Sequence, residues 1–247
     1  MTIRVAVVGA TGRMGQLATQ LIEQADDLEI AAAIGSSDSL DGMTGADVVL
    51  DLTLPQSSQL VVDHAVQLGI PTVVGTSGWS SDRIASLQRV VAGKPGLGVL
   101  IIPNFSVGSV LASSFAAQAA RFFDSIEIVE AHHASKVDSP SGTAVRTAEL
   151  MGAARGVLGP VAAPHVDQRA RGQQVSSIPI HSLRMHGVVA QQDVVFGGTG
   201  EVLTIRHETL SASAYEAGIL LALRAAVTAR GVVVGLDKLI DLGLDKA

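Results

Sequence analysis

The segment 130–143 carries the densest set of side chains in this sequence that could do chemistry. His132 and His133 are adjacent, Lys136 follows, and Ser141-Gly142-Thr143 opens a helical pattern. Imidazole and ammonium groups can deliver protons or stabilise developing negative charge, and the first N–H groups of a helix attract anions. Taken singly, each feature is usually a solvated side chain or a plain helix cap. Together they suit a small dicarboxylate.

A glycine turn near the N-terminus is the second candidate site. It reads Gly9-Ala10-Thr11-Gly12-Arg13-Met14-Gly15 and joins a strand pattern at 4–8 to a helical pattern at 13–25. Gly9 permits a tight turn, Gly12 lets the backbone approach a pyrophosphate, and Gly15 lets the helix pack closely on the strand. The spacing G-x-x-G-x-x-G is a variant of the commoner dinucleotide-binding motif, so the alternative is a glycine turn without a ligand.

The elements around this turn predict a parallel sheet. Strand patterns occur at 4–8, 30–34, 47–52, 72–74 and 99–102, and helical patterns occur at 13–25 and 60–68. These strands are apolar on both faces, as in a parallel sheet that is covered on both sides by helices.

After residue 105 the pattern changes. We expect a helix at 106–123, a strand at 126–131, a helix at 141–154 with Ser141 as its N-cap, and a polar loop at 156–177. Three alternating strands at 178–185, 188–196 and 201–207 then favour an antiparallel meander. A helix at 214–229 and an apolar strand at 232–234 then return to the strand-and-helix pattern of the first half.

We therefore predict an α/β fold with two domains. Residues 1–105 plus 215–247 form a Rossmann-like doubly wound parallel sheet that binds a dinucleotide. Residues 106–214 form an inserted α+β domain with a mostly antiparallel sheet, which binds substrate and forms the oligomer interface.

Composition limits the remaining choices. The chain has 247 residues, no cysteine and a formal net charge of −6. We expect no disulfide, no metal site, no nucleic-acid partner and a cytoplasmic location. One stretch without charged residues, 95–120, is interrupted at Pro103-Asn104, so we interpret it as a buried strand, a turn and a helix rather than a membrane span.

The segment 130–143 closely resembles the E-x-H-H-x-x-K-x-D-x-P-S-G-T signature of the dihydrodipicolinate reductases (4-hydroxy-tetrahydrodipicolinate reductases). The resemblance continues in Gly75-Thr76-Ser77-Gly78, in Pro103-Asn104-Phe105-Ser106 and in the strands at 196–207. These motifs follow the family's order from residue 5 to residue 207, and the actinobacterial members resemble the chain most.

The resemblance implies an NAD(P)H-dependent enzyme of lysine and diaminopimelate biosynthesis that reduces a cyclic dicarboxylate. It implies His132 and Lys136 as the acid–base pair. Substrate contacts then come from His133, Lys136, Ser141, Gly142 and Thr143. The cofactor contacts it implies are the glycine turn from Gly9 to Gly15, together with Gly75, Thr76, Ser77, Ile102, Pro103, Asn104 and Phe105. It also implies a homotetramer, and the strand region 178–207 would otherwise expose apolar faces.

The choice between NADH and NADPH depends on the end of the second strand. Many relatives carry an acid there, which binds the ribose hydroxyls and repels a 2′-phosphate. Here the position is Gly35, followed by Ser36-Ser37-Asp38. The serines and Arg13 could bind a phosphate, so we expect dual use with a preference for NADPH. Asp38 acts in the other direction if it folds back, which the sequence leaves open.

Two other interpretations share the fold. One is another small NAD(P)-dependent oxidoreductase, such as an aspartate dehydrogenase-like enzyme, against which the His-His-x-x-Lys segment argues. The other is a dinucleotide sensor without catalysis, against which the presence of His132, Lys136 and Thr143 argues. Which of His132 and Lys136 delivers the proton stays open.

Overall fold

The computed structural model describes residues 2–241, which form two compact units. Unit 1 combines the described residues up to Ser106 with those from Tyr215 onward, and unit 2 spans Val107–Ala214. Each unit has a sheet of its own. Within residues 2–241, no helix is long and apolar enough to cross a membrane.

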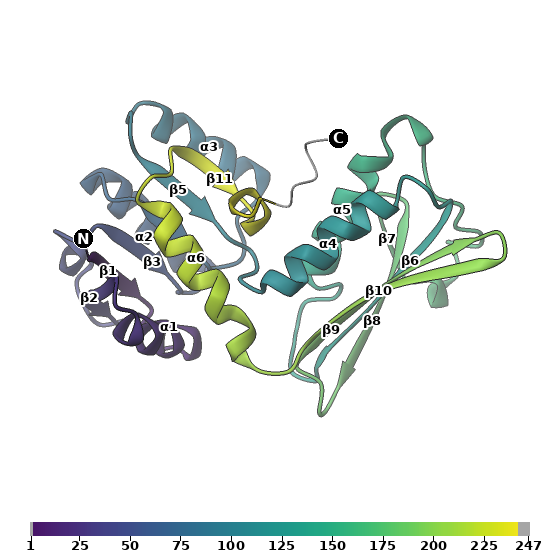
Figure 1. Cartoon of the computed structure of the whole chain (residues 1–247), viewed down its shortest axis with the longest axis horizontal. Helices are drawn as coiled ribbons and strands as arrows, with labels where there is room; N and C mark the ends of the chain where they lie inside the picture. The colour runs from purple at the N-terminus through teal and green to yellow at the C-terminus, as the bar shows by residue number, and fades with distance from the viewer. Residues whose placement is uncertain (1, 242–247) are drawn as a thin grey trace. The chain divides into compact units, whose positions relative to one another are not determined.

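Unit 1 is built on a six-stranded sheet in the order β11-β5-β4-β3-β1-β2, with every neighbouring pair parallel (Figure 1). Its strands are β1 (Ile3–Val8), β2 (Leu28–Ile34), β3 (Val48–Asp51), β4 (Thr72–Val74), β5 (Gly98–Ile101) and β11 (Gly231–Val234). The register pairs Val8 with Asp51, Asp51 with Val74, and Val74 with Ile101. The last residues of the central strands therefore meet along one edge, and the predicted parallel sheet is confirmed.

Helices cover both faces of this sheet, because the connections from β1 and from β3 run in opposite directions. Helices α1 (Arg13–Gln24) and α6 (Glu216–Ala226) contact each other, while α2 (Pro55–Leu68) packs with α3 (Ser81–Ala92) against the strands. Strand residues such as Val7, Val49 and Leu100 are fully buried. Burying each such side chain contributes about 1.5–3 kcal/mol.

Helix α3 was not predicted, although its signals are in the sequence. Ser80 is its N-cap, and the Ser80 hydroxyl accepts from the Arg83 backbone N–H at 3.4 Å. Leu87 and Val91 are buried against the sheet, and Gly93 follows the last turn. An N-cap serine, an apolar stripe and a terminal glycine together mark a short amphipathic helix.

Unit 2 carries a five-stranded mixed sheet in the order β10-β9-β6-β8-β7 (Figure 1). The strands are β6 (Ser125–His133), β7 (Gln173–Val175), β8 (Ile178–Met185), β9 (Ala190–Gly198) and β10 (Glu201–Thr209). All pairings are antiparallel except that of β6 with β8. The prediction of a mostly antiparallel sheet is confirmed.

The expectation of a three-strand meander is wrong for β8, since β6 lies between β8 and β9. Ile126 and Ile128 of β6 are almost fully buried. A central position suits such an apolar strand, because it has a hydrogen-bonded neighbour on each side. The region expected to be a loop at 156–177 also contains β7, which is an edge strand beside β8.

Helices α4 (Val107–Ala119) and α5 (Gly142–Arg155) cover one face of this second sheet. Ile126, Met151 and Phe196 are almost fully buried in the core between them. Leu183, Met185 and Val202 lie on the opposite face and are exposed. Short 3₁₀ helices occur at Leu40–Met43, Gly156–Leu158, Arg169–Arg171, Ala212–Tyr215 and Leu236–Leu239.

Candidate active site

The glycine turn follows β1 at the carboxyl edge of the parallel sheet. Gly9 has a φ of +87°, and a Cβ there would lie 2.6 Å from the Leu52 carbonyl oxygen. A Cβ at Gly15 would lie 2.1 Å from the Gly9 carbonyl oxygen, so the chain's own packing requires both glycines. Among the described residues, no side chain caps the first turn of α1, where Thr11 and Gly12 are exposed. Its N–H groups can therefore receive an anion.

Two further turns lie on the same edge of the sheet, after β4 and after β5. The Thr76 hydroxyl is within 3.4 Å of the carbonyl oxygens of Asp51 and Thr53. Phe105 is buried, and a Cβ at Gly75 would lie 2.5 Å from its ring. Thr76 and Phe105 therefore stabilise the turns at this edge of the sheet through buried contacts. The other predicted cofactor residues are buried Ile102, partly buried Asn104, and exposed Ser77 and Pro103.

A fully buried carboxylate, Asp51, ends β3 between these turns. It accepts from the Thr53 backbone N–H at 3.0 Å and from the Thr53 hydroxyl at 2.6 Å. It also accepts from the Ser58 hydroxyl, which in turn accepts from the Trp79 indole N–H at 3.0 Å. Asp51 thus fixes the turn after β3 to the loop after β4. The sequence analysis assigned it no role.

The turn after β2 carries an acid, Asp38, whose orientation the sequence left open. Asp38 turns back, and its carboxylate accepts from the Gly35 backbone N–H at 2.8 Å. A Cβ at Gly35 would lie 3.3 Å from Asp38 Oδ2 and 3.3 Å from the Thr11 methyl group. A negative charge therefore stands beside the glycine turn even though the residue that follows the strand is a glycine.

In unit 2, the two adjacent histidines point to opposite faces of β6, as strand geometry predicts. His132 Nδ1 lies 2.6 Å from Glu130 Oε2, on the face that α5 covers. His133 Nδ1 lies 2.9 Å from the Ser135 hydroxyl. An ionised carboxylate can only accept, so the Nδ1 atom of His132 carries a proton and its Nε2 atom is left for other chemistry.

Glu130 is fully buried and binds several elements of the candidate site at once. It accepts from Arg184 Nη1 at 2.9 Å and Nη2 at 3.0 Å, and from the Ser141 backbone N–H at 3.2 Å. Burial by itself raises the pKa of this carboxyl. Hydrogen bonds from His132, Arg184 and Ser182 outweigh burial and lower the pKa to about 2.

Lys136 lies in the turn that follows β6, where its backbone N–H donates to the His133 carbonyl oxygen at 3.0 Å. Its Nζ atom donates to Asp138 Oδ1 at 2.7 Å. Burial raises the pKa of Asp138, but the hydrogen bond and charge of Lys136 lower it further, so the net pKa is below its ordinary value. Arg184 Nη2 donates to the Asp138 carbonyl oxygen at 2.5 Å and so holds the same turn.

The N-terminus of α5 faces solvent beside these groups. Ser141 is its N-cap, as predicted, and the Ser141 hydroxyl accepts from the Ala144 N–H at 3.2 Å. Gly142 is exposed, and no described atom lies within 4 Å of a Cβ placed on it. The chain's own packing therefore does not require glycine here. Thr143, the third predicted residue of this group, is half-buried.

The structure gives Glu130 and Arg184 roles that the sequence analysis did not assign. A signal for Glu130 was present, since a residue two positions before His132 on a strand shares its face. Arg184 could not be placed from sequence, because its position depends on the parallel pairing of His132 with Arg184 across β6 and β8.

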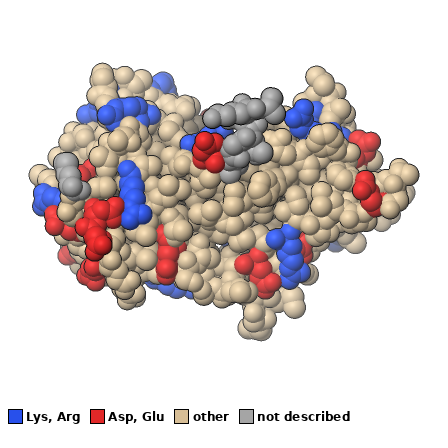
Figure 2. All heavy atoms as spheres, in the orientation of Figure 1, with Lys and Arg blue, Asp and Glu red and all other residues tan. Residues whose placement is uncertain are grey.

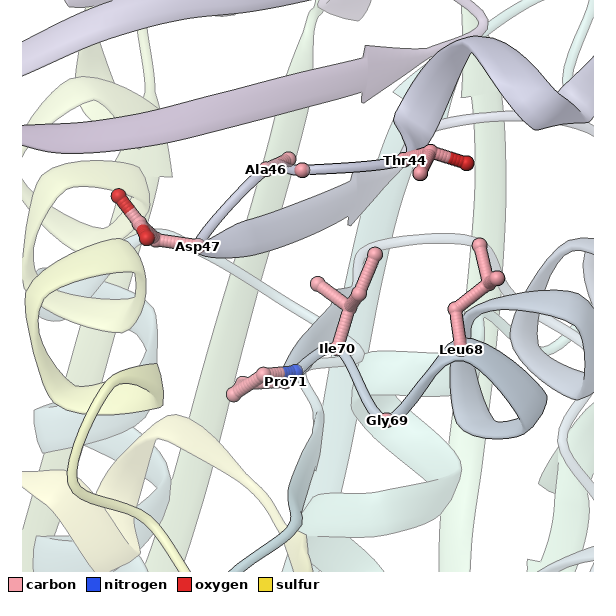
Figure 3. Close-up of a pocket in the computed structure, with 8 residues that line it drawn as sticks. Thr44, Ala46, Asp47, Leu68, Gly69, Ile70 and Pro71 are labelled. Atoms are coloured by element: carbon pink, nitrogen blue, oxygen red, sulfur yellow. The ribbon is translucent and has the colours of Figure 1, made fainter.

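A separate cavity of about 380 Å³ lies at the opposite edge of the first sheet (Figure 3). It is lined by residues at the starts of β3 and β4, including Ala46, Asp47, Ile70 and Pro71. The Asp47 carboxylate accepts from the Arg4 backbone N–H at 2.8 Å, so it has a structural partner within the fold. Ligands of open α/β sheets bind at the carboxyl ends of the strands, so this cavity lies away from the candidate site.

Charges of both signs occur on the face drawn in Figure 2. Acidic and basic side chains are interspersed there, and the described Lys and Arg residues form no continuous basic patch on it.

Comparison with known proteins gives one consistent result. The family described as dihydrodipicolinate reductase, N-terminus, matches residues 3–105, and its C-terminal counterpart matches residues 108–240. A 4-hydroxy-tetrahydrodipicolinate reductase from Clavibacter michiganensis subsp. michiganensis is 70% identical over 98% of this chain and 87% of the relative. One from Streptomyces griseus subsp. griseus is 47% identical over 97% of this chain and 98% of the relative.

Solved structures agree with these matches. A dipicolinate-bound dihydrodipicolinate reductase from Paenisporosarcina sp. TG-14 superposes with a TM-score of 0.83 and 29% identity, covering 97% of this chain and all of the other. An amine dehydrogenase from Mycobacterium smegmatis, at 11% identity and a TM-score of 0.68, shares the fold alone. Because the two family matches together span nearly the whole chain, the protein belongs to the dihydrodipicolinate reductase family.

Proposed function

We propose that the protein catalyses the NAD(P)H-dependent reduction of 4-hydroxy-tetrahydrodipicolinate to tetrahydrodipicolinate in lysine and diaminopimelate biosynthesis. The single observation that carries the proposal is the cluster at the end of β6. There His132, Lys136 and the open N-terminus of α5 occur together in a chain of this family. Both halves of the chain match the reductase family, which removes the reason to prefer an aspartate dehydrogenase-like enzyme.

Unit 1 is proposed to bind the dinucleotide. The uncapped first turn of α1 fits a pyrophosphate, because its N–H groups and partial positive charge are available to an anion. The turns at Gly75–Ser77 and Ile102–Phe105 share this sheet edge and are proposed to hold the nicotinamide end. When bound, the nicotinamide supplies a hydride to C4 of the substrate ring.

Unit 2 is proposed to bind the substrate and to assemble the oligomer. His133, Lys136, Ser141, Gly142 and Thr143 would contact the carboxylates, with Gly142 leaving room for close approach. Loss of the 4-hydroxyl group as water gives the ring a conjugated C=C–C=N unit, and hydride addition at C4 then drives the electrons of that unit onto the ring nitrogen. A cation at Lys136 or His132 stabilises that charge, and one of the two delivers a proton to the ring carbon next to C4.

We propose dual use of NADH and NADPH, with a preference for NADPH because Gly35 stands after β2 in place of an acid and Arg13 is exposed at the start of α1. The turned-back carboxylate of Asp38 limits that preference, because a negative charge beside the glycine turn repels a 2′-phosphate. We also propose a homotetramer, formed through the exposed sheet face with Leu183, Met185 and Val202, that works in the cytoplasm. Light scattering at micromolar concentration tests the tetramer.

The direct test is oxidation of NADH and NADPH by the protein in a dihydrodipicolinate synthase reaction mixture. Turnover that requires the synthase supports the proposal, and pyridine-2,6-dicarboxylate should inhibit competitively with substrate. Tight binding of dinucleotide without turnover would instead support a sensor. Inhibition that substrate does not relieve would count against a substrate site at the α5 N-terminus.

A further inference from the structure

Glu130 and Arg184 form an ion pair in a part of the molecule where charges are costly. Glu130 is fully buried, and the Arg184 side chain is only 19% exposed. Removing two such charges from water offsets much of their attraction, so a buried pair is weak evidence for stability. A role in placing other groups accounts for the pair better.

The contacts of the pair reach three elements of the candidate site. Glu130 Oε2 holds Nδ1 of His132 at 2.6 Å, and Glu130 Oε1 holds the backbone N–H of Ser141 at 3.2 Å. Arg184 holds the Asp138 carbonyl oxygen, two residues beyond Lys136. One ion pair thus ties together the end of β6, the turn that carries Lys136 and the first residue of the α5 cap.

We propose that Glu130 and Arg184 are the positioning residues of this reaction. Glu130 fixes the Nδ1–H form of His132, so that the Nε2 atom is left to exchange a proton with the substrate. Arg184 holds Glu130 in place and fixes the turn of Lys136. The inference rests on the proposed function for its kinetic consequences, whereas the tautomer of His132 is a property of the protein alone.

The carboxylate also matters for proton transfer. When His132 is protonated on both nitrogens, it can release the Nε2 proton to the substrate carbon and keep the Nδ1 proton that it donates to Glu130. A proton from the bulk solvent then restores the charged ring. A negative carboxylate stabilises the charged ring, and a neutral amide at position 130 does not.

Strand β6 offers a matched control on its other face. Glu127 accepts from His181 Nε2 at 2.7 Å and also from Arg171, so the same three residue types form a second cluster. Glu127→Gln removes one carboxylate charge from the same strand without touching His132, Lys136 or α5. Light scattering of this variant checks that its assembly is unchanged.

The experiment compares Glu130→Gln with Glu127→Gln in the full-length protein. An amide can donate as well as accept, so Glu130→Gln should let the Nε2–H form of His132 appear in ¹⁵N spectra of histidine-labelled protein. The His132 signals are assigned from His132→Gln. We expect kcat to fall about 10- to 100-fold, the scale for removing a group that orients a catalytic ligand, with the Kd for NADPH unchanged.

Arg184→Lys provides a second variant in case Glu130→Gln folds poorly. Lysine keeps the positive charge but loses the bidentate hydrogen bonds to Glu130. The turn that carries Lys136 should then loosen, so KM for substrate should rise. Unchanged His132 signals in Glu130→Gln, or a kcat within twofold of wild type, would overturn the inference. Absence of turnover in the wild type would instead refute the proposed function, while the spectra would still test the tautomer.

Discussion

Two clusters with the same three residue types lie on opposite faces of one strand. Glu130, His132 and Arg184 face the helices, while Glu127, His181 and Arg171 lie on the other face. The Glu130 side chain is fully buried, whereas Glu127 is 32% exposed. The two clusters share residue types and strand spacing, so burial and neighbouring groups are what distinguish them.

In both carboxylates, hydrogen bonds outweigh burial and favour the charged form, but the neighbouring groups differ. For Glu127, burial raises the pKa, and hydrogen bonds from Arg171 and His181 lower it below its ordinary value. For Glu130 the net pKa falls to about 2. The Glu127 cluster is partly exposed, so solvent screens it more than the Glu130 cluster, and surface ion pairs contribute only about 0–1 kcal/mol. Breaking a buried pair costs far more.

The largest difference should appear in catalysis. His132→Ala and Lys136→Ala should each lower kcat by roughly 10²–10³-fold, the scale for removing one preorganised electrostatic group. Binding of NADPH should stay nearly intact. His181→Ala, the matched change in the other cluster, should leave kcat within twofold. Steady-state kinetics decide the matter. If His132→Ala or Lys136→Ala keeps more than half of the wild-type rate, the assigned role of that residue is wrong.

The next difference should appear in stability. Glu130→Ala leaves the mostly buried Arg184 guanidinium unpaired, so the free energy of unfolding should fall by about 3–5 kcal/mol. Glu127→Ala should lower it by less, about 1 kcal/mol, because that cluster is partly exposed and the groups left behind can be solvated. Urea unfolding followed by circular dichroism measures both. Equal losses for the two variants would erase the distinction between the clusters.

The low pKa of Glu130 should also make the stability of the fold depend on pH. The pKa of Glu130 is about 2 in the folded protein against 4.5 ordinarily, so the unfolded chain binds its proton first. This group therefore stabilises the fold above pH 4.5, and up to about 3 kcal/mol is lost as the pH falls towards 2. Urea midpoints from pH 6 to pH 3 should fall less steeply for Glu130→Gln than for wild type. Parallel slopes would contradict the shift.

The end of α5 allows stability and function to be separated. Gly142→Ala places a methyl group in open space within a helix, so it should leave stability unchanged or raise it by up to about 1 kcal/mol. The same methyl group should obstruct a carboxylate at the helix N-terminus and weaken pyridine-2,6-dicarboxylate about tenfold, equivalent to 1.4 kcal/mol. Calorimetric titration measures this, with Gly93→Ala at the end of α3 as a distant control, because Gly93 has a negative φ and a Cβ there would make only an ordinary 3.5 Å contact. Unchanged affinity would remove Gly142 from the substrate site.

The sequence predicted what depends on local pattern. The apolar strands of unit 1 and the N-cap role of Ser141 follow from periodicity and capping rules, and the opposite directions of His132 and His133 follow from strand alternation. Strand order in unit 2 could not be predicted, because the parallel pairing of β6 with β8 depends on contacts distant in the chain. For the same reason the partnership of Glu130 with Arg184 was missed.

The orientation of Asp38 was also beyond the sequence, since a short polar turn after a strand can take several conformations. The structure turns its carboxylate back to the Gly35 N–H. This gives a third carboxylate for the comparison, exposed and with one hydrogen bond from its own turn. Its effects should be correspondingly small and confined to the choice of cofactor.

Opposite changes at this turn should therefore move cofactor selectivity in opposite directions. Asp38→Asn keeps an oxygen that can accept from Gly35 but removes the charge that repels a 2′-phosphate. It should raise kcat/KM for NADPH relative to NADH by about threefold to tenfold, or up to 1.4 kcal/mol. Gly35→Asp adds a second carboxylate next to Asp38 and Thr11, so it should weaken NADPH by like-charge repulsion and shift selectivity towards NADH. Steady-state kcat/KM for both cofactors, in wild type and both variants, measures the shifts. A wild type that prefers NADH tenfold or more, and an Asp38→Asn variant that keeps this ratio, would show that neither position sets the choice.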